Sequence, residues 1–439
     1  MDILIKVVQL LASLSILVLI HEMGHFLAAK LFKVRVEKFY LFFNPWFTPI
    51  KFKPKNSETE YGIGWLPLGG YVKLAGMVDE SMDTNQLKQP VQDWEFRSKP
   101  AWQRLIIMAA GVIMNFVLAI AIYAATLFYY GEEYVPLHKV SLGMSFSEVA
   151  KKQGFQDGDI LIAADGKTLK RLDEDNFRKI LNAKQVLVNR AGDLTMVQLT
   201  EDFPQQLIAS NEGFTSYRIP FVVREVMPET PAFGAGLQKG DSVVSVNDDV
   251  LCTQDEFSNV FLANKNTQIM IGFYRQGDFL STYITPDSAG MIGVYLTPFY
   301  EVYPTTKVTY GVLKSIPAGI KKGVKKFTGY ASDMKHLMSK QGAESIGGFG
   351  SITQLFPPFF SFEIFLEITA YLSVILAFMN ILPIPALDGG HIAFLTYEVI
   401  TRRKVSQEVM MTAQKIGLLL LLFLLFYANG MDVVRAFFR

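Results

Sequence analysis

The sequence predicts a multi-span α-helical membrane protein with four transmembrane helices and a soluble α+β region between the second and the third. Three observations support this fold class. Half of the 439 residues are hydrophobic, and the mean hydropathy is positive. Four apolar stretches are long enough to cross a hydrocarbon core of roughly 30 Å at about 1.5 Å per helical residue. Residues 131–304, in contrast, are more polar and rich in strand-like segments.

Charge and cysteine content exclude several kinds of partner and site. The formal net charge is +1, so the chain lacks the basic excess that is typical of nucleic-acid binding, and no nucleic acid is expected as a partner. Cys252 is the single cysteine of the sequence. A lone cysteine permits neither an intrachain disulfide nor a cysteine metal site.

The first apolar stretch, Val7–Ala29, contains the motif His-Glu-x-x-His. His21 and His25 are four residues apart and therefore lie on one face of a helix, where both can point a ring nitrogen at one metal ion. Glu22 is placed to act as the general base, as in zinc proteases with this motif. The motif also occurs by chance, but here these three residues are the only ionisable groups of the span. Ionisable groups are costly there, so we expect a catalytic Zn²⁺ site.

A β-hairpin is predicted after this span, over about residues 57–77. Basic residues from Lys30 to Lys55 precede it and mark the cytoplasmic side of the membrane. Apolar runs flank Gly69-Gly70, which is typical of a hairpin, and its place beside a span indicates that it is membrane-associated. Its edge could bind an extended substrate by strand addition. An ordinary amphipathic hairpin on the surface is the alternative.

The second span, Leu105–Tyr130, completes a first region, residues 1–130. It is uncharged and contains Asn115 in its first half. Basic residues before it again mark the cytoplasmic side, so the span runs outward. A lone asparagine in a span is often only a helix–helix contact.

Residues 131–304 contain an internal repeat. The run Gly154-Phe-Gln-Asp-Gly-Asp159 recurs as Gly236-Leu-Gln-Lys-Gly-Asp241, at an offset of 82 residues. Two modules, 131–220 and 221–304, are therefore expected. The pattern Ala-Gly-Leu-x-x-Gly-Asp, followed by an apolar strand and a turn, resembles PDZ domains, and the second copy matches it more closely. PDZ modules bind extended peptides beside a strand; a gating role without a peptide ligand is the alternative.

The C-terminal part contains the other two spans. Residues 305–356 form a linker with a lysine-rich amphipathic stretch, expected to lie as a helix on the membrane surface. Residues 357–439 hold a third span, Ile368–Leu387, which runs inward, and a fourth with its core at Gly417–Met431. Two prolines, Pro383 and Pro385, should break the third helix near its end.

Asp388 is the best candidate for the third zinc ligand. Two histidines leave a catalytic site one protein ligand short. Spans one and three run in the same direction, so Asp388 and the histidine pair lie toward the same side of the membrane. His391 is the competing ligand, but the glycines and prolines around Asp388 favour a short carboxylate on a bent backbone.

The combined motifs resemble the site-2 protease family over nearly the whole chain. The similarity rests on four features: the His21–His25 motif in the first span, Leu66-Pro-Leu-Gly-Gly-Tyr-Val-Lys73, the tandem PDZ-like repeats, and Asn380 followed by Pro383 and Leu387-Asp-Gly-Gly390. The resemblance implies an intramembrane zinc metalloprotease. It implies the following roles: metal ligands His21, His25 and Asp388; catalytic base Glu22; substrate-binding residues Asn380, Gly69, Gly70, Tyr71 and Asn115.

The resemblance also implies partners and a location. Substrates would be single-span membrane proteins that have already lost their outer domain, such as anti-sigma factors, and remnant signal peptides. The protein would be a multi-pass protein of the bacterial inner (cytoplasmic) membrane, with its PDZ modules in the periplasm and its active site toward the cytoplasm. Leu41–Trp46 departs from the family pattern, which leaves local loop geometry open. A catalytically inactive PDZ-bearing membrane scaffold is the competing hypothesis, and a zinc protease with a cytosolic site and a glutamate ligand is a second.

Overall fold

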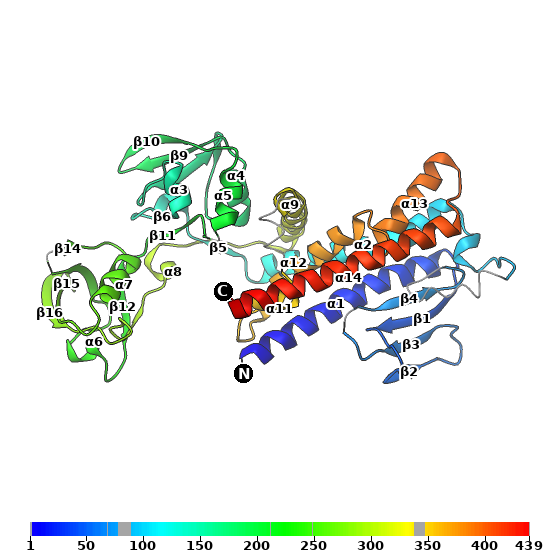
Figure 1. The fold of residues 1–439 in the computed structure, drawn as a ribbon, viewed down its shortest axis with the longest axis horizontal. Coiled ribbons are helices and arrows are strands. Elements are labelled where there is room, and N and C mark those ends of the chain that lie inside the picture. Colours follow the sequence, from blue (N-terminus) through cyan, green and yellow to red (C-terminus); the bar gives the residue numbers. More distant parts are fainter. Residues whose placement is uncertain are drawn as a thin grey trace. The chain divides into compact units, whose positions relative to one another are not determined.

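The computed structural model describes residues 2–67, 69–77, 89–210, 212–247, 249–337 and 347–438. The chain divides into two compact units. The first unit combines Met1–Gly131 with Thr309–Arg439, and the second is the segment between them, Glu132–Val308 (Figure 1). Each unit is described by itself.

The four predicted spans are confirmed as helices of the first unit that are long and apolar enough to cross a membrane. They are α1 (Asp2–Leu31), α2 (Ala101–Tyr129), α12 (Phe362–Ile381) and α14 (Gln407–Phe438). Helix α12 begins at Phe362 and ends at Ile381, whereas the predicted third span began at Ile368 and ended at Leu387. The residue before a proline disfavours helical backbone, and Leu382, which precedes Pro383, is extended.

Helices α1 and α2 pack closely because glycine lies at their crossing. A Cβ atom at Gly24 of α1 would overlap the backbone of Ala110 in α2. The same close approach brings the second half of α1, which carries the His-Glu-x-x-His motif, against the first half of α2.

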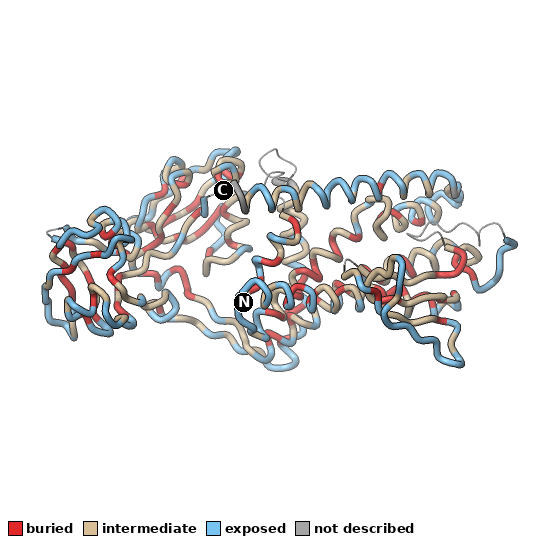
Figure 2. Tube along the Cα trace, turned by 60° about the horizontal axis from the view of Figure 1, so that its bottom comes forward, coloured by how far each residue is buried: buried red, intermediate tan, exposed pale blue. Residues whose placement is uncertain are grey.

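Helix α14 is held near both of its ends and is largely exposed between them (Figure 2). Toward its N-terminal end, Gly417 fits against the backbone of Pro385. Toward its C-terminal end, the Asp432 carboxylate accepts hydrogen bonds from the backbone N–H groups of Gly348 and Ser351, both at 3.0 Å. Asp432 thereby caps the short helix α11 (Phe349–Gln354). The exposed leucine and phenylalanine side chains are suited to contact with lipid.

A four-stranded sheet lies beside α1, and it corrects the predicted hairpin. Its strands are β1 (Val36–Leu41), β2 (Ile50–Phe52), β3 (Glu60–Ile63) and β4 (Tyr71–Leu74), in the order β2-β3-β1-β4. The strands on either side of Gly69-Gly70 do not pair with each other, because β1 lies between them, parallel to β3 and antiparallel to β4. In Figure 1, β4 is the strand nearest to α1.

Helix α9 (Val312–Leu337) packs on the helices of the first unit through the face that carries Ser315, Gly319 and Gly323, which are buried. Gly319 allows this approach, since a Cβ atom there would lie 2.7 Å from the backbone nitrogen of Ala124 in α2. Lys322 pairs with Glu367 of α12 at 2.7 Å and lies over the ring of Tyr123 at 4.9 Å. Thr126 donates a further hydrogen bond to Glu367 at 3.0 Å. The carboxylate inside α12 therefore has two partners.

The second unit consists of two modules with the same order of strands and helices. The first contains β6 (Met144–Phe146), α3 (Glu148–Lys152), β7 (Ile160–Ala164), β8 (Lys167–Thr168), α4 (Glu174–Leu181), β9 (Gln185–Arg190), β10 (Asp193–Gln198), α5 (Phe203–Ser210) and β11 (Thr215–Tyr217). The second contains β12 (Phe221–Val226), α6 (Pro231–Gly234), β13 (Ser242–Val246), β14 (Asp249–Val250), α7 (Gln254–Ala263), β15 (Ile269–Arg275), β16 (Asp278–Ile284) and β17 (Val294–Leu296). Strands β7, β9 and β10 correspond to β13, β15 and β16 in pairing order, and β6–β11 corresponds to β12–β17. Helix α5 is an addition to the first module.

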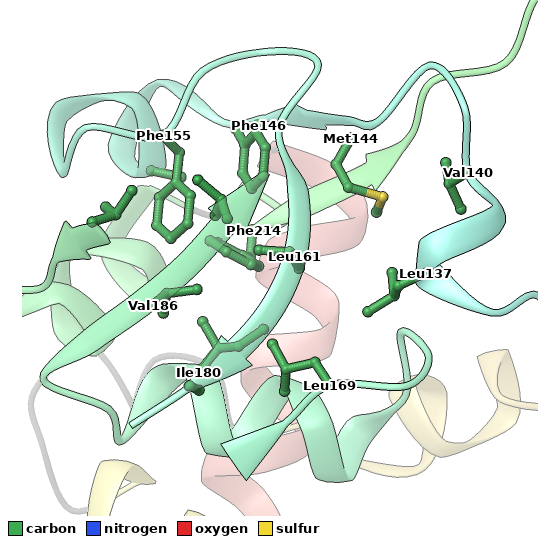
Figure 3. Close-up of a cluster of buried hydrophobic side chains, with 14 of the residues drawn as sticks. Leu137, Val140, Met144, Phe146, Phe155, Leu161, Leu169, Ile180, Val186 and Phe214 are labelled. Atoms are coloured by element: carbon green, nitrogen blue, oxygen red, sulfur yellow. The ribbon is translucent and has the colours of Figure 1, made fainter. Parts of the chain in front are cut away.

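Each module has its own hydrophobic core and its own buried ion pair. In the first, Phe146, Phe155 and Phe214 pack together above Leu161 and Val186 (Figure 3). The repeated aspartates are almost fully buried and pair with arginines: Asp159 with Arg190 at 2.8 Å, and Asp241 with Arg275 at 2.7 Å.

The two ends of the second unit meet in a two-stranded sheet. Strand β5 (Glu132–Tyr134) pairs antiparallel with β18 (Thr306–Val308), with Glu132 opposite Val308. The chain therefore enters and leaves this unit through adjacent residues.

Candidate metal centre

Helix α1 presents both histidines of the motif toward one point. The four-residue spacing puts them on one face, and their rings meet edge to face with centroids 4.9 Å apart. The Nε2 atoms of His21 and His25 are 3.3 Å apart. Both rings are largely buried, with side-chain exposures of 12% and 9%.

Asp388 reaches the same point from the start of α13 (Asp388–Thr401). Its Oδ2 lies 3.1 Å from His21 Nε2 and 3.2 Å from His25 Nε2. The bend after α12 brings α13 close to that helix, and glycine is needed there because a Cβ atom at Gly389 would overlap the carbonyl of Leu382. The prolines and glycines that predicted a bent backbone around Asp388 thus lie where the chain turns back on itself.

The three donor atoms fit a divalent cation such as zinc. Among the described residues, this cluster is the group of histidine, cysteine and acidic side chains whose donor atoms converge closely enough to hold a metal ion. Two imidazole nitrogens and a carboxylate oxygen form a typical donor set for catalytic zinc. Ligands about 2.0–2.2 Å from a tetrahedral ion lie roughly 3.3–3.6 Å from one another, so the donors would need to move apart only slightly.

The far sides of the two histidine rings contact α2. His25 Nδ1 lies 2.9 Å from the carbonyl oxygen of Ile107, and His21 Nδ1 lies 3.2 Å from the side-chain nitrogen of Asn115. Gly111, halfway between those two positions, leaves room for the rings, because a Cβ atom there would overlap His25 Nε2. One face of α2 thus forms the wall behind both rings.

Glu22 lies between the histidine pair and strand β4. It is buried, and a Cβ atom at Gly70 would come within 3.3 Å of its Cγ atom. Gly70 directly precedes β4, so Glu22 lies beside the start of that strand. A proton-accepting group is thereby placed next to both the donor cluster and the first residues of an edge strand.

The other predicted site residues have different surroundings. Gly69 has a positive φ of 152° and faces the ring of Phe43, and the Tyr71 hydroxyl donates to the side chain of Asn44 at 3.0 Å. Asn380 is buried in the last turn of α12. His391, the competing ligand, is turned to Gln414 of α14, with 2.8 Å between the two Nε2 atoms, and lies outside the donor cluster.

Three features of the site were not predicted from the sequence. The carbonyl of Ile107 leaves no signal, because any residue could supply it. Gly111 had a weak signal, since it precedes Asn115 by four residues and shares its helix face. The contact of Asn115 with a candidate ligand, instead of with another helix alone, was also not foreseen.

Comparison with known proteins decides the family. The model of peptidase family M50, which holds the site-2 proteases, matches residues 9–424. The chain belongs to peptidase family M50. This confirms the resemblance found in the sequence, and it agrees with an enzyme that hydrolyses peptide bonds.

Several relatives match the chain from end to end. "Protease RseP" of Yersinia pestis is 30% identical over 475 residues, which cover 99% of this chain and all of the relative. "Regulator of sigma E protease" of Haemophilus influenzae is 28% identical and covers 96% of this chain and 97% of its own length. A relative from Xylella fastidiosa, provisionally described as a zinc metalloprotease, is 27% identical over 96% of each chain.

Among solved structures, the PDZ domain of an SdrC-like protein from Listeria monocytogenes matches 19% of this chain and 90% of its own length. The identity is 20% and the TM-score is 0.16, and at that score the likeness assigns no fold to either module.

Proposed function

We propose that this M50 peptidase is an intramembrane zinc metalloprotease that hydrolyses a peptide bond within a transmembrane segment of single-span membrane proteins. The observation that carries the proposal is the cluster of His21, His25 and Asp388, with Glu22 beside it in an apolar helix. Ionisable groups are costly in such a helix, and a bound cation accounts for His21 and His25 of this helix together with Asp388.

Each residue of the cluster has a defined task in this mechanism. His21 and His25 would hold the zinc ion through Nε2, and Asp388 through Oδ2. When bound, zinc supplies Lewis-acid chemistry, acidifying a water molecule and polarising a carbonyl oxygen. The Glu22 carboxylate takes a proton from the attacking water and afterwards delivers it to the nitrogen of the leaving amine. Burial of Glu22 keeps that proton away from bulk water between the two transfers.

Strand β4 would hold the substrate in extended form. A peptide carbonyl inside a transmembrane helix is bonded within that helix, so the segment must unwind before it can be attacked. Strand β4 is an edge of its sheet, and its first residues lie next to Glu22. Gly69, Gly70 and Tyr71 would align the added strand, and Asn380, eight residues before Asp388, would hold a substrate carbonyl.

The two modules of the second unit would be a tandem pair of PDZ domains that restrict access to the membrane site. Support comes from the shared strand order of the modules and from the repeated Gly-Asp motif. We place them in the periplasm, with the active site toward the cytoplasm, in the inner membrane of a bacterium. Substrates, such as anti-sigma factors and remnant signal peptides, would be cleaved after an earlier protease has removed their outer domain.

Cleavage by the reconstituted protein tests the proposal. Wild type should cleave a single-span substrate in liposomes, and a zinc chelator should abolish the reaction. Glu22→Gln should bind zinc as wild type does and show no cleavage. Glu363→Gln, which alters an exposed carboxylate in the first turn of α12, serves as the matched control and should remain active. Equal activity of Glu22→Gln and wild type would contradict the proposal, and inactivity of every preparation despite zinc binding would favour the scaffold alternative.

A further inference from the structure

Asn115 has no role in the mechanism above, although it touches one of the candidate ligands. It lies in the middle of α2 and is fully buried. Its side-chain nitrogen is 3.2 Å from His21 Nδ1, and its side-chain oxygen has no hydrogen-bond partner among the described residues. Its backbone oxygen accepts a hydrogen bond from Ser373 of α12 at 2.7 Å. A buried amide against a candidate metal ligand calls for an explanation.

The chemistry of a metal-binding imidazole supplies one. A neutral imidazole carries one hydrogen, so a ring that offers the Nε2 lone pair to a cation must carry its hydrogen on Nδ1, and that N–H needs an acceptor. For His25 the acceptor is present, since the carbonyl oxygen of Ile107 lies 2.9 Å from Nδ1. For His21, the group at hydrogen-bond distance from Nδ1 among the residues that the structure describes is the Asn115 amide.

The amide can meet this need because its two ends are nearly equal in size. A half-turn of the amide group places the oxygen where the nitrogen lies, with little change in the space it fills. In that orientation Asn115 accepts from His21 Nδ1–H. In the opposite orientation the amide nitrogen donates to an unprotonated Nδ1, and the ring hydrogen is then on Nε2.

We propose that Asn115 is a positioning residue that fixes His21 in the tautomer whose Nε2 lone pair faces the metal, and that it does not bind substrate. The proposal rests on the zinc site of the proposed function. In this arrangement α2, which carries no metal ligand, supplies a hydrogen-bond partner for the Nδ1 atom of each histidine: the Ile107 carbonyl for His25 and the Asn115 amide for His21. Gly111 leaves the space that the two rings occupy.

Zinc affinity of the full-length protein in detergent, measured by competition with a chelator, tests this assignment. Asn115→Leu removes the acceptor and should weaken zinc binding by about 10–100-fold, the usual effect of losing an outer-shell partner. Asn115→Ala should weaken zinc binding to the same extent. If one of these two variants does not fold, the other can be used for the test. Asn115→Asp has a similar shape and always offers an acceptor, so it should bind zinc at least as tightly as wild type.

Ser373→Ala is the matched control. It removes a hydrogen bond to the backbone of Asn115 without touching His21, and it should leave zinc affinity unchanged. Wild-type affinity in Asn115→Leu and Asn115→Ala, or a loss in Asn115→Asp equal to theirs, would overturn the proposal. So would an increase in KM with unchanged zinc affinity, which is the signature of a substrate contact. Failure of wild type to bind zinc would instead refute the proposed function itself.

Discussion

At the scale of single residues, the cluster of His21, His25 and Asp388 depends on the absence of a side chain at Gly111. Gly111 lies against both rings, and a Cβ atom there would overlap His25 Nε2 and lie 2.8 Å from His21 Cε1. The rings cannot give way without losing the donor distances of 3.1–3.3 Å. The identity of this residue should therefore affect the candidate metal site as directly as the identity of a candidate ligand.

Gly111→Ala should weaken zinc binding at least as much as the loss of an outer partner, about 10–100-fold, because the added methyl group displaces His25. The measurement is chelator competition on the purified protein. Gly430→Ala in α14 is the control, since nothing lies within 4 Å of a Cβ atom there. Equal zinc affinity in wild type and Gly111→Ala would show that the rings can shift without loss.

At the scale of secondary structure elements, a charged pair joins α9 to α12. Glu367 is an acid in a helix that is otherwise suited to the membrane, and Lys322 of α9 neutralises it at 2.7 Å. The amphipathic pattern of α9 predicted a membrane-surface helix, and its packing on α2 and α12 shows that part of its polar face is used within the protein.

Lys322→Met should lower the free energy of unfolding by about 1.5–3 kcal/mol, the usual contribution of a hydrogen bond to a charged group. Glu367→Gln added to Lys322→Met should recover part of the loss, because no unpaired charge remains. Thermal unfolding of the two single variants and the double variant in detergent gives the coupling energy. Additive losses would mean that the two side chains do not interact.

The repeated ion pair should stabilise each module of the second unit separately. Arg190→Met should destabilise the first module and Arg275→Met the second, each by about 1.5–3 kcal/mol, since each arginine pairs with an almost fully buried aspartate. Hydrogen exchange resolved by module is the measurement. Arg224→Met, whose partner Glu301 is also exposed, should change stability by less than about 1 kcal/mol. Loss of protection in the other module would contradict independence.

The sequence predicted elements whose signal is local and missed those that depend on distant pairing. Uncharged runs located the four spans, and the Gly-Asp repeat located both modules. The parallel pairing of β1 with β3 leaves no local signal, so the hairpin prediction was wrong. The aspartates of the repeat are 82 residues apart (241 minus 159), but the arginines are 85 apart (275 minus 190), because the segment between differs in length. A search for residues that repeat at one fixed offset therefore could not predict the ion pair.

At the scale of the whole molecule, the second unit is an insertion with adjoining ends. Glu132 and Val308 face each other in the β5–β18 pair, and opposed residues of an antiparallel pair have Cα atoms about 4.5–5.5 Å apart. A two- or three-residue linker can therefore join Gly131 to Thr309 without moving the ends of α2 and α9.

Removal of residues 132–308 should leave a membrane unit that folds and binds zinc with unchanged affinity. If the modules restrict access, this shortened protein should cleave a single-span substrate that still carries its outer domain, whereas the full chain should cleave only the trimmed substrate. Both proteins are compared on both substrates in liposomes. Cleavage of the untrimmed substrate by the full chain would refute the gating role.

The Lys322–Glu367 pair also bears on how the protein is made. A ribosome delivers the chain from its N-terminus, and Thr126 and Lys322, the two partners of Glu367, both precede it. Translation thus provides α2 and α9 before α12. When α12 inserts, the partners of the Glu367 carboxylate have therefore already been synthesised. We therefore expect the production of correctly inserted protein, and not only its final stability, to depend on the order in which these helices are encoded.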